Sequence, residues 1–343
     1  ERLFVGSPVE VDSTIFVMAI AFAIVGALYA ILGGLRAVAV SDTYSGVLIL
    51  SLAVLVVILA LNAINWDFSG VPAERLNMFI GNELEDGSET PIPWHTLLTG
   101  MIFVQTFYWS TNQTITQRAM AAPNIKEAQK GVLTAAGIRL LIVPAIVVIP
   151  GIVSYKLYGD IGDPAYGRIV GDVLPAWLSG AFAAGIAAAV LTTFNSILNA
   201  SAALYVCDIH EAYIDRPQGV AKLSAVVSIV MSVLAIALVP FFASQESLIN
   251  TVQELYGLLS MPILSAFIVC LVFKNVKAGA AMIGVVTGVV FYGVWSMYWQ
   301  PAHYIHGMFV TLMLSIATAL VMNKLVFGQT AKLAIGKGNA ASA

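Results

Sequence analysis

The chain has 343 residues, of which 59% are hydrophobic and only 10% are charged, and its formal net charge is −3. Ordinary soluble domains carry about 25% charged residues, so this composition excludes a soluble globular protein. The few basic residues are scattered along the chain, which excludes a nucleic-acid surface. The composition therefore predicts a protein of the lipid bilayer.

Nine apolar runs are long enough to cross a bilayer, because about 20 helical residues span the hydrocarbon region. Each run is predicted to be a helix, since lipid offers no partner for backbone N–H and C=O groups. The sequence thus predicts an all-α polytopic membrane protein. In chain order, the predicted spans are 14–33, 42–63, 97–113, 133–155, 180–206, 219–242, 247–273, 278–298 and 304–327.

The basic residues predict the orientation, because Lys and Arg are retained on the cytoplasmic side of a membrane. With the N-terminus outside, the predicted outer loops hold four basic residues and the inner loops hold eleven. We therefore expect a multi-pass protein of the plasma (inner) membrane with a cytoplasmic C-terminus. The acidic segment 65–93 is then an outer loop. The inner residues are Arg36, Arg118, Lys126, Lys130, Arg216, Lys222, Lys274, Lys277, Lys324, Lys332 and Lys337.

Enzyme chemistry finds no support in the sequence, which has no P-loop, no HExxH and no GxSxG motif. The four histidines are not expected to cluster: His95 and His210 fall on opposite sides of the membrane, and His303 and His306 lie at an outer helix end. We therefore expect neither an enzyme nor a cofactor. The first residues, "ERLFVGSPVEVDST", include no initiating Met and no signal peptide, so we expect a fragment.

The predicted span 180–206 carries unusual polar chemistry. Gly185, Ala189, Thr192, Ser196 and Asn199 recur at spacings of three and four, so they form one stripe along a helix. One interpretation is helix packing through small and hydroxyl-bearing residues.

A second interpretation concerns Thr192 and its neighbour Thr193. Their hydroxyls, together with a backbone carbonyl one turn earlier, offer three neutral oxygens. A hard monovalent cation prefers such a shell of oxygens. The pair is therefore a candidate ion site.

A second polar run, "QTFYWSTNQTITQR", places Gln105, Tyr108, Trp109, Asn112 and Gln113 in and after the predicted span 97–113. Amide groups beside aromatic rings suit a sugar, whose hydroxyls form hydrogen bonds and whose C–H face stacks on rings. Interfacial anchoring of Trp and Tyr is the alternative.

Charged and amide groups also occur at or inside other spans. Gln253 and Glu254 lie near the start of an apolar span. We expect them either to contact a solute or to cap the helix at the membrane interface. Asp42 begins the second span, where the helix dipole favours an acidic residue at the N-terminus. Arg139 lies two turns inside the fourth span, where it snorkels or faces the solute path. In contrast, "GVVTG" at 284–288 predicts close helix packing.

Five segments together carry a resemblance to a known family. They are "LYAILGGLRAVAVSD", "YWSTNQTITQRAMAA", "IVPAIVVIPGI", "AAAVLTTFNSILNASAALYVCDIHEAY" and "VQELYGLLSMPIL". In this order they resemble successive segments of the sodium:solute symporter family, and in particular its sodium/sugar branch. The resemblance implies a partial LeuT-type inverted-repeat fold of about nine transmembrane helices.

The resemblance also implies an organisation for the single transmembrane domain 1–343. Residues 13–63 correspond to the end of the first repeat and 94–273 to the second inverted repeat. Residues 274–327 form two peripheral helices, and 328–343 form a cytoplasmic tail. The first three core helices of the family have no counterpart in the chain.

Site residues follow from the same resemblance. The Ala189 carbonyl and the Thr192 and Thr193 hydroxyls match sodium-binding positions, although many relatives have serine at both hydroxyl positions. Asp42 matches an acidic residue on the ion's inner route. The sugar-side positions are Gln105, Arg139 and Gln253 as contacts, and Tyr108 with Trp109 as the inner gate.

The predicted function is sodium-coupled symport of a sugar or similar small polar solute by alternating access, with sodium as the coupling ion and no other cofactor. The expected partners are the solute, sodium and the lipid bilayer. Two alternatives stay open. One is symport of a non-sugar solute such as a carboxylate, sialic acid, an amino acid or inositol, and the other is a transporter-like membrane sensor.

Overall fold

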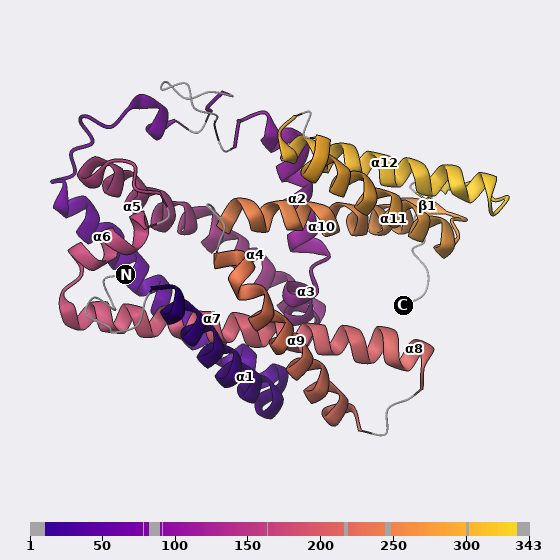
Figure 1. The fold of residues 1–343 in the computed structure, drawn as a ribbon, viewed down its shortest axis with the longest axis horizontal. Coiled ribbons are helices and arrows are strands. Elements are labelled where there is room, and N and C mark those ends of the chain that lie inside the picture. Colours follow the sequence, from indigo (N-terminus) through magenta and orange to yellow (C-terminus); the bar gives the residue numbers. More distant parts are fainter. Residues whose placement is uncertain are drawn as a thin grey trace. The chain divides into compact units, whose positions relative to one another are not determined.

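A computed structural model describes the chain as two compact units, each built from two stretches of sequence. Unit 1 comprises Glu1–Leu76 and Gln117–Glu246, and unit 2 comprises Asn77–Thr116 and Ser247–Ala343. The elements of both units are labelled in Figure 1. The described residues are 11–77, 79–81, 90, 92–162, 164–215, 219–243, 248–299 and 302–334.

Unit 1 is a bundle of helices in which the long helix α1 packs against α5, α6, α7 and α9. Its apolar core joins Leu52 and Val56 of α1 to Val153 of α5, Ile169 of α6 and Phe182 of α7. The helical elements of unit 1 are α1 (Val11–Ala63), η2 (Ala73–Leu76), α4 (Ile125–Leu141), α5 (Val143–Tyr158), α6 (Ala165–Val173), α7 (Ala176–Ala203), η4 (Leu204–His210), α8 (Glu211–Tyr213) and α9 (Val220–Ala243). Helix α3 (Gln113–Met120) carries the chain from unit 2 to unit 1.

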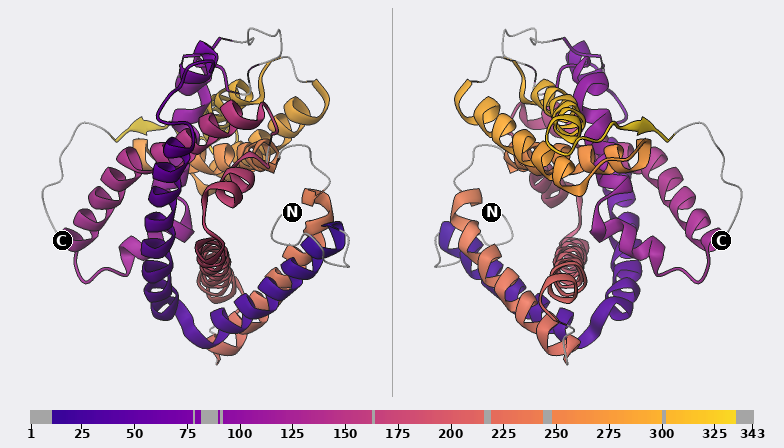
Figure 2. Two further views of the ribbon diagram at one scale, coloured as in Figure 1. Left: turned by 90° about the vertical axis from the view of Figure 1, so that its left-hand side faces the viewer. Right: turned by 90° about the vertical axis from the view of Figure 1, so that its right-hand side faces the viewer.

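Helix α1 corrects one prediction, because the expected break between spans 14–33 and 42–63 does not exist. The helix runs without interruption over 53 residues. Its two apolar stretches, Phe16–Ile31 and Ala39–Ala63, coincide with the two predicted spans. They run in different directions, as the indigo and purple parts of α1 show in Figure 2. Adjacent glycines occupy positions 33 and 34, and such pairs allow a helix to bend sharply.

Unit 2 is built around helices α10, α11 and α12, which pack against one another in pairs. Gly284 and Gly288 confirm the predicted close packing. A Cβ at Gly284 would lie 2.6 Å from the carbonyl oxygen of Ser315, and one at Gly288 would lie 3.0 Å from the ring of Pro262. The elements are η3 (Leu97–Met101), α2 (Ile102–Ser110), α10 (Leu248–Val272), β1 (Phe273–Lys274), α11 (Ala278–Val294), η5 (Trp295–Trp299), α12 (Tyr304–Leu325) and β2 (Lys332–Leu333).

A short antiparallel ladder was not predicted. Strands β1 and β2 pair Phe273 with Leu333 and Lys274 with Lys332. Asn323 supports the neighbouring turn, because its amide nitrogen donates to the carbonyl oxygens of Asn275 and Gln329 at 2.8 Å.

Among the described residues, eight apolar helices correspond to predicted spans, whereas the ninth predicted span, 97–113, is not among the apolar helices. That stretch is a shorter helix, because the π-helical η3 runs directly into the nine-residue α2, which ends at Ser110. The hydroxyls of Thr106, Ser110 and Thr111 each donate to a carbonyl four residues earlier, an arrangement that bends and weakens a helix. The long helices are Ala39–Ala63, Ile125–Tyr158, Ala176–Tyr213, Val220–Phe242, Thr251–Val272 and Tyr304–Leu325, and the shorter ones are Phe16–Ile31 and Ala278–Val294.

Candidate ion and solute sites

Helix α7 brings two of the predicted ion ligands together. The Thr192 hydroxyl donates to the Ala189 carbonyl oxygen at 3.1 Å, and the Thr192 side chain is only 8% exposed. Thr193 follows about 100° further around the helix, and its side chain is exposed. The structure thus joins Ala189 to Thr192, whereas Thr193 lies on an adjacent face of the same helix.

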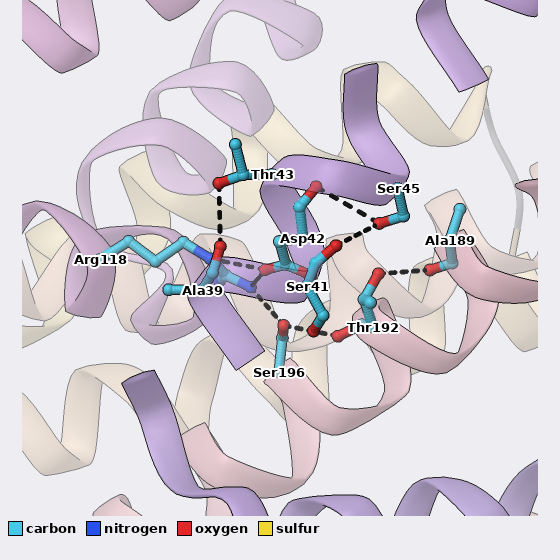
Figure 3. Close-up of polar contacts among 9 residues, drawn as sticks. All are labelled: Ala39, Ser41, Asp42, Thr43, Ser45, Arg118, Ala189, Thr192 and Ser196. Atoms are coloured by element: carbon cyan, nitrogen blue, oxygen red, sulfur yellow. Dashed lines mark hydrogen bonds and ion pairs between the residues drawn. The ribbon is translucent and has the colours of Figure 1, made fainter. Parts of the chain in front are cut away.

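Asp42 of α1 forms the ionic part of this region. Its Oδ2 atom accepts a hydrogen bond from Arg118 Nε at 3.1 Å and a closer one from Arg118 Nη2. Arg118 Nη2 also donates to the Ser196 hydroxyl, which in turn donates to the Thr192 carbonyl oxygen at 2.7 Å. Figure 3 shows this path from Asp42 to α7. Asp42 therefore reaches the Thr192 segment through Arg118 and Ser196.

The Arg118 side chain places a permanent positive charge beside the predicted ion site. Its side chain is 35% exposed and that of Asp42 is 24% exposed, so the pair is partly shielded from water. A guanidinium stays charged at any physiological pH. Asp42 is therefore already neutralised by a tethered cation in this arrangement.

The sequence pattern alone does not reveal the roles of two of these residues. By sequence, Arg118 is an ordinary loop cation and Ser196 belongs to the packing stripe of its helix. A signal was present, because Arg118 and Asp42 are opposite charges that were both expected at the inner ends of spans. Their spacing in the sequence, 76 residues, gives no indication that the two side chains form an ion pair.

Helices α2 and α10 bring together most of the predicted solute residues of unit 2. The Trp109 indole nitrogen donates to the Gln105 amide oxygen at 3.1 Å. The Tyr108 ring meets the Trp109 ring edge-on at 5.2 Å and the Tyr256 ring of α10 at 6.4 Å. Gln253 lies on α10 one turn before Tyr256, with a half-buried side chain. Amide groups and aromatic faces thus occur together.

The other two solute candidates lie in different settings. The Asn112 amide oxygen accepts a hydrogen bond from the backbone nitrogen of Thr114 at 3.0 Å, so it caps the start of α3. Arg139 belongs to unit 1, where it occupies the last turn of α4 with an exposed side chain. A cation at that position also interacts favourably with the helix dipole. The solute roles of both residues remain predictions.

The histidines of unit 2 contradict the expectation that they would not cluster. The His95 and His306 rings stack at 5.0 Å with an interplanar angle of 7°. The Thr99 hydroxyl lies 2.8 Å from His306 Nδ1. The expectation was wrong because η3 packs on the start of α12, where a Cβ at Gly100 would lie 2.2 Å from the Ile305 carbonyl oxygen. Even so, the described residues hold no group of three or more His, Cys, Asp or Glu side chains that could bind a metal.

The described start of the predicted outer loop is anchored rather than free. Lys156 of α5 forms an ion pair with Asp67 at 3.0 Å, and Arg75 forms one with Asp160 at 2.6 Å. Hydrogen bonds from Ser69 and the nearby Lys156 ammonium lower the pKa of Asp67 to about 2. Most of the acidic part, residues 82–89, lies outside the described residues.

Residues 9–288 match the sodium:solute symporter family. The chain is 31% identical over 304 residues to the uncharacterized symporter YidK of Escherichia coli (strain K12), which covers 84% of this chain and 52% of that protein. It is 33% identical over 217 residues to the sodium/glucose cotransporter of Vibrio parahaemolyticus, which covers 57% of this chain and 40% of that protein. The chain therefore spans about half the length of the curated relatives it matches.

A solved structure shares the fold. It is a Na+-coupled sialic acid symporter in a substrate-bound outward-open state, with a TM-score of 0.73 and 18% sequence identity over 90% of this chain and 66% of that chain. This likeness confirms a helical membrane protein of LeuT-type fold, and the division into repeats stays a prediction. The family is one of multi-pass membrane transporters, as predicted, and not of enzymes. The chain belongs to the sodium:solute symporter family.

Proposed function

We propose that the protein is a secondary active transporter that couples uptake of a small polar solute to the sodium gradient by alternating access. The observation that carries this proposal is the Thr192 hydroxyl in contact with the Ala189 carbonyl oxygen, inside a long apolar helix. Polar groups at such positions are costly in lipid and mark solute or ion paths. Family membership supports sodium as the ion.

Sodium binding at α7 would use neutral oxygens. The Thr192 hydroxyl oxygen keeps its lone pairs while it donates to Ala189, so it can accept a cation without breaking the helix. Thr193 supplies another hydroxyl on the adjacent face. A membrane potential that is negative inside drives each sodium inward by about 2.3 kcal/mol per 100 mV.

Arg118 would favour the release of sodium. Its guanidinium is held between Asp42 and Ser196, close to the Thr192 segment. A fixed positive charge at Arg118 repels a sodium ion in the site. In the predicted orientation this pair lies toward the cytoplasm, which is the side where sodium must leave.

The finer proposal is that the solute is a sugar. Gln105, Trp109, Tyr108 and Tyr256 supply amide groups and ring edges, with Gln253 one turn away. A sugar uses both kinds of contact. The similar protein of Vibrio parahaemolyticus is named a sodium/glucose cotransporter.

A carboxylated sugar is the second candidate, and Arg139 favours it. Its guanidinium is suited to a carboxylate through two parallel hydrogen bonds. The solved structure with a similar fold is described as a sialic acid symporter. Uptake of a neutral hexose and uptake of sialic acid should therefore be measured in the same experiment.

The test is uptake into proteoliposomes by protein made from the full reading frame that contains this chain. An inward sodium gradient should drive accumulation of at least one labelled solute from a panel of neutral sugars, inositol, sialic acid and amino acids. A potassium gradient of equal size is the control. Sodium-dependent binding without accumulation would instead indicate a sensor and would refute the transport proposal.

A further inference from the structure

The two-stranded ladder of unit 2 lies where three apolar helices end or begin. Strand β1 (Phe273–Lys274) directly follows α10, and β2 (Lys332–Leu333) comes shortly after α12. Helix α11 begins at the same end, at Ala278, close to β1 in Figure 1. The apolar stretches of α10 and α12 are both long enough to span a membrane. The ladder therefore falls at the boundary between these spans and water.

The register of the ladder places two positive charges opposite each other. Lys274 pairs directly with Lys332, and both side chains are exposed. Residues paired in this way project from the same face with their Cβ atoms about 4.5–5.5 Å apart, and like charges at such positions are destabilising. An anion bound between the two ammonium groups would remove this repulsion.

A third lysine adds to the charge at this turn. Lys277 lies three residues after Lys274 and directly precedes α11, whose dipole presents its positive end there. Its side chain is also exposed. In the part of the chain that the structure describes, the ion pairs involve none of these three lysines. The turn thus concentrates positive charge without a counter-ion from the described residues.

Buried contacts hold this turn in place. The fully buried Asn323 side chain accepts a hydrogen bond from the backbone nitrogen of Lys277 at 2.9 Å. Its amide nitrogen donates at 2.8 Å to one carbonyl oxygen in the segment before α11 and to one in the segment before β2. The Phe327 ring packs on α11, where a Cβ at Gly279 would lie 2.7 Å from it. The fold therefore keeps the facing lysines together in spite of their repulsion.

The other face of the ladder is apolar. Phe273 pairs with Leu333, whose side chain is 67% exposed. Successive residues of a strand point to opposite faces, so one face carries the lysines and the other carries these apolar side chains. An amphipathic element at the end of membrane spans suits the headgroup region of a bilayer, where apolar groups meet acyl chains and cations meet phosphates.

We propose that Lys274, Lys277 and Lys332 bind the phosphate of an anionic phospholipid headgroup. An ammonium group donates up to three hydrogen bonds and phosphate oxygens accept them, so one phosphate bridges the two facing lysines. A lipid fits this surface because the charged face adjoins three apolar helices and an exposed apolar face. The inference depends neither on the identity of the solute nor on the coupling ion.

The test measures the thermal unfolding midpoint of the full-length protein in a neutral detergent against the concentration of a short-chain phosphatidylglycerol. A ligand that binds the folded state raises this midpoint with its concentration. Short-chain phosphatidylcholine, which has no net charge, is the lipid control, and inorganic phosphate is the control for a free anion. The wild-type protein should respond at a lower concentration of phosphatidylglycerol than of either control.

Replacement of the facing lysines should weaken this response. Lys274→Gln combined with Lys332→Gln should raise the half-saturating concentration of phosphatidylglycerol about thirty-fold, which is about five-fold for each cation removed. Lys126→Gln combined with Lys222→Gln is the matched control, because it removes two exposed lysines from α4 and α9. This control should leave the response unchanged.

A charge reversal separates lipid binding from folding. Lys332→Glu places opposite charges across the ladder, and such pairs stabilise neighbouring strands. The midpoint without lipid should therefore rise or stay the same, while the response to phosphatidylglycerol falls to that of phosphatidylcholine.

Three outcomes would overturn the inference. One is an unchanged phosphatidylglycerol response in Lys332→Glu or in the variant that lacks both facing lysines. Another is an equal loss of response in the variant with changes at Lys126 and Lys222, which would show an effect of net charge alone. The third is an equal response of the wild-type protein to inorganic phosphate, which would indicate a site for free anions instead of a lipid.

Discussion

Loss of the Thr192 hydroxyl should weaken sodium binding without unfolding the protein. Thr192→Val keeps the branched shape and removes the oxygen that donates to Ala189 at 3.1 Å. One neutral oxygen contact contributes about 0.5–1.5 kcal/mol, which corresponds to about a two- to twelve-fold change in affinity. We therefore expect the half-saturating sodium concentration for uptake to rise within that range.

The stability of the helix should change little in this variant. The lost hydroxyl bond lies within one helix, where its net contribution is about 1 kcal/mol. Thr and Val have similar helix propensities, and the site is already buried. Thr192→Ser retains the oxygen and should keep sodium affinity near the wild-type value.

The assay is initial solute uptake against external sodium, normalised to the amount of protein in the membrane. Thr287→Val is the matched control, because the Thr287 hydroxyl donates to the Ile283 carbonyl oxygen at 2.9 Å in α11 in a similar way. It should leave sodium dependence unchanged. Equal half-saturating sodium for wild type, Thr192→Val and Thr287→Val would refute the ion site on α7.

Three further predictions follow from named contacts. Asp42→Asn and Arg118→Gln should each lower the thermal midpoint, and a double-mutant cycle should give a coupling of about 1 kcal/mol, since the pair is partly exposed; additive effects would contradict the pair. Tyr108→Ala should abolish sodium-driven accumulation per inserted molecule while Tyr108→Phe retains part of it, and near-normal accumulation by the alanine variant would exclude a gate. The pKa of Asp67 is lowered from 3.8 to about 2, so the ionised Asp67 stabilises the fold fully at pH values above 3.8 and loses this effect as the pH falls toward 2. Asp67→Asn should remove this acid-dependent part of the thermal stability profile. An unchanged profile would show that the Asp67 contacts do not stabilise the fold.

Local geometry explains which features could be predicted from the sequence. Positions three and four apart share a helix face, so the proximity of Thr192 to Ala189 and Ser196 follows from the spacing alone. The same reasoning predicted the close packing at Gly284 and Gly288. Apolar length likewise identified the long helices, because the bilayer sets the minimum number of residues.

Apolar length does not determine where a helix begins and ends. Two apolar stretches joined by Gly33 and Gly34 have the same sequence pattern whether a loop separates two helices or one helix bends between them. The structure has one bent helix. The helix within the predicted span 97–113 is shorter than expected for another reason, and it ends at Ser110. Its hydroxyl groups bond to their own backbone, and Asn112 starts a new helix, so short polar contacts override the apolar pattern.

Contacts between distant parts of the chain explain what the sequence could not show. Arg118 and Asp42 are 76 residues apart, and Thr99 and His306 are 207 apart. Each of these residues has an ordinary local explanation as a loop cation, a helix start or an interfacial group. Their chemistry appears only when the fold places them together, as it does for Asp42, Arg118 and Ser196. A charged residue at the end of a span should therefore be considered together with every residue of opposite charge that is expected at the same face of the membrane. Asp42 and Arg118 are such a pair.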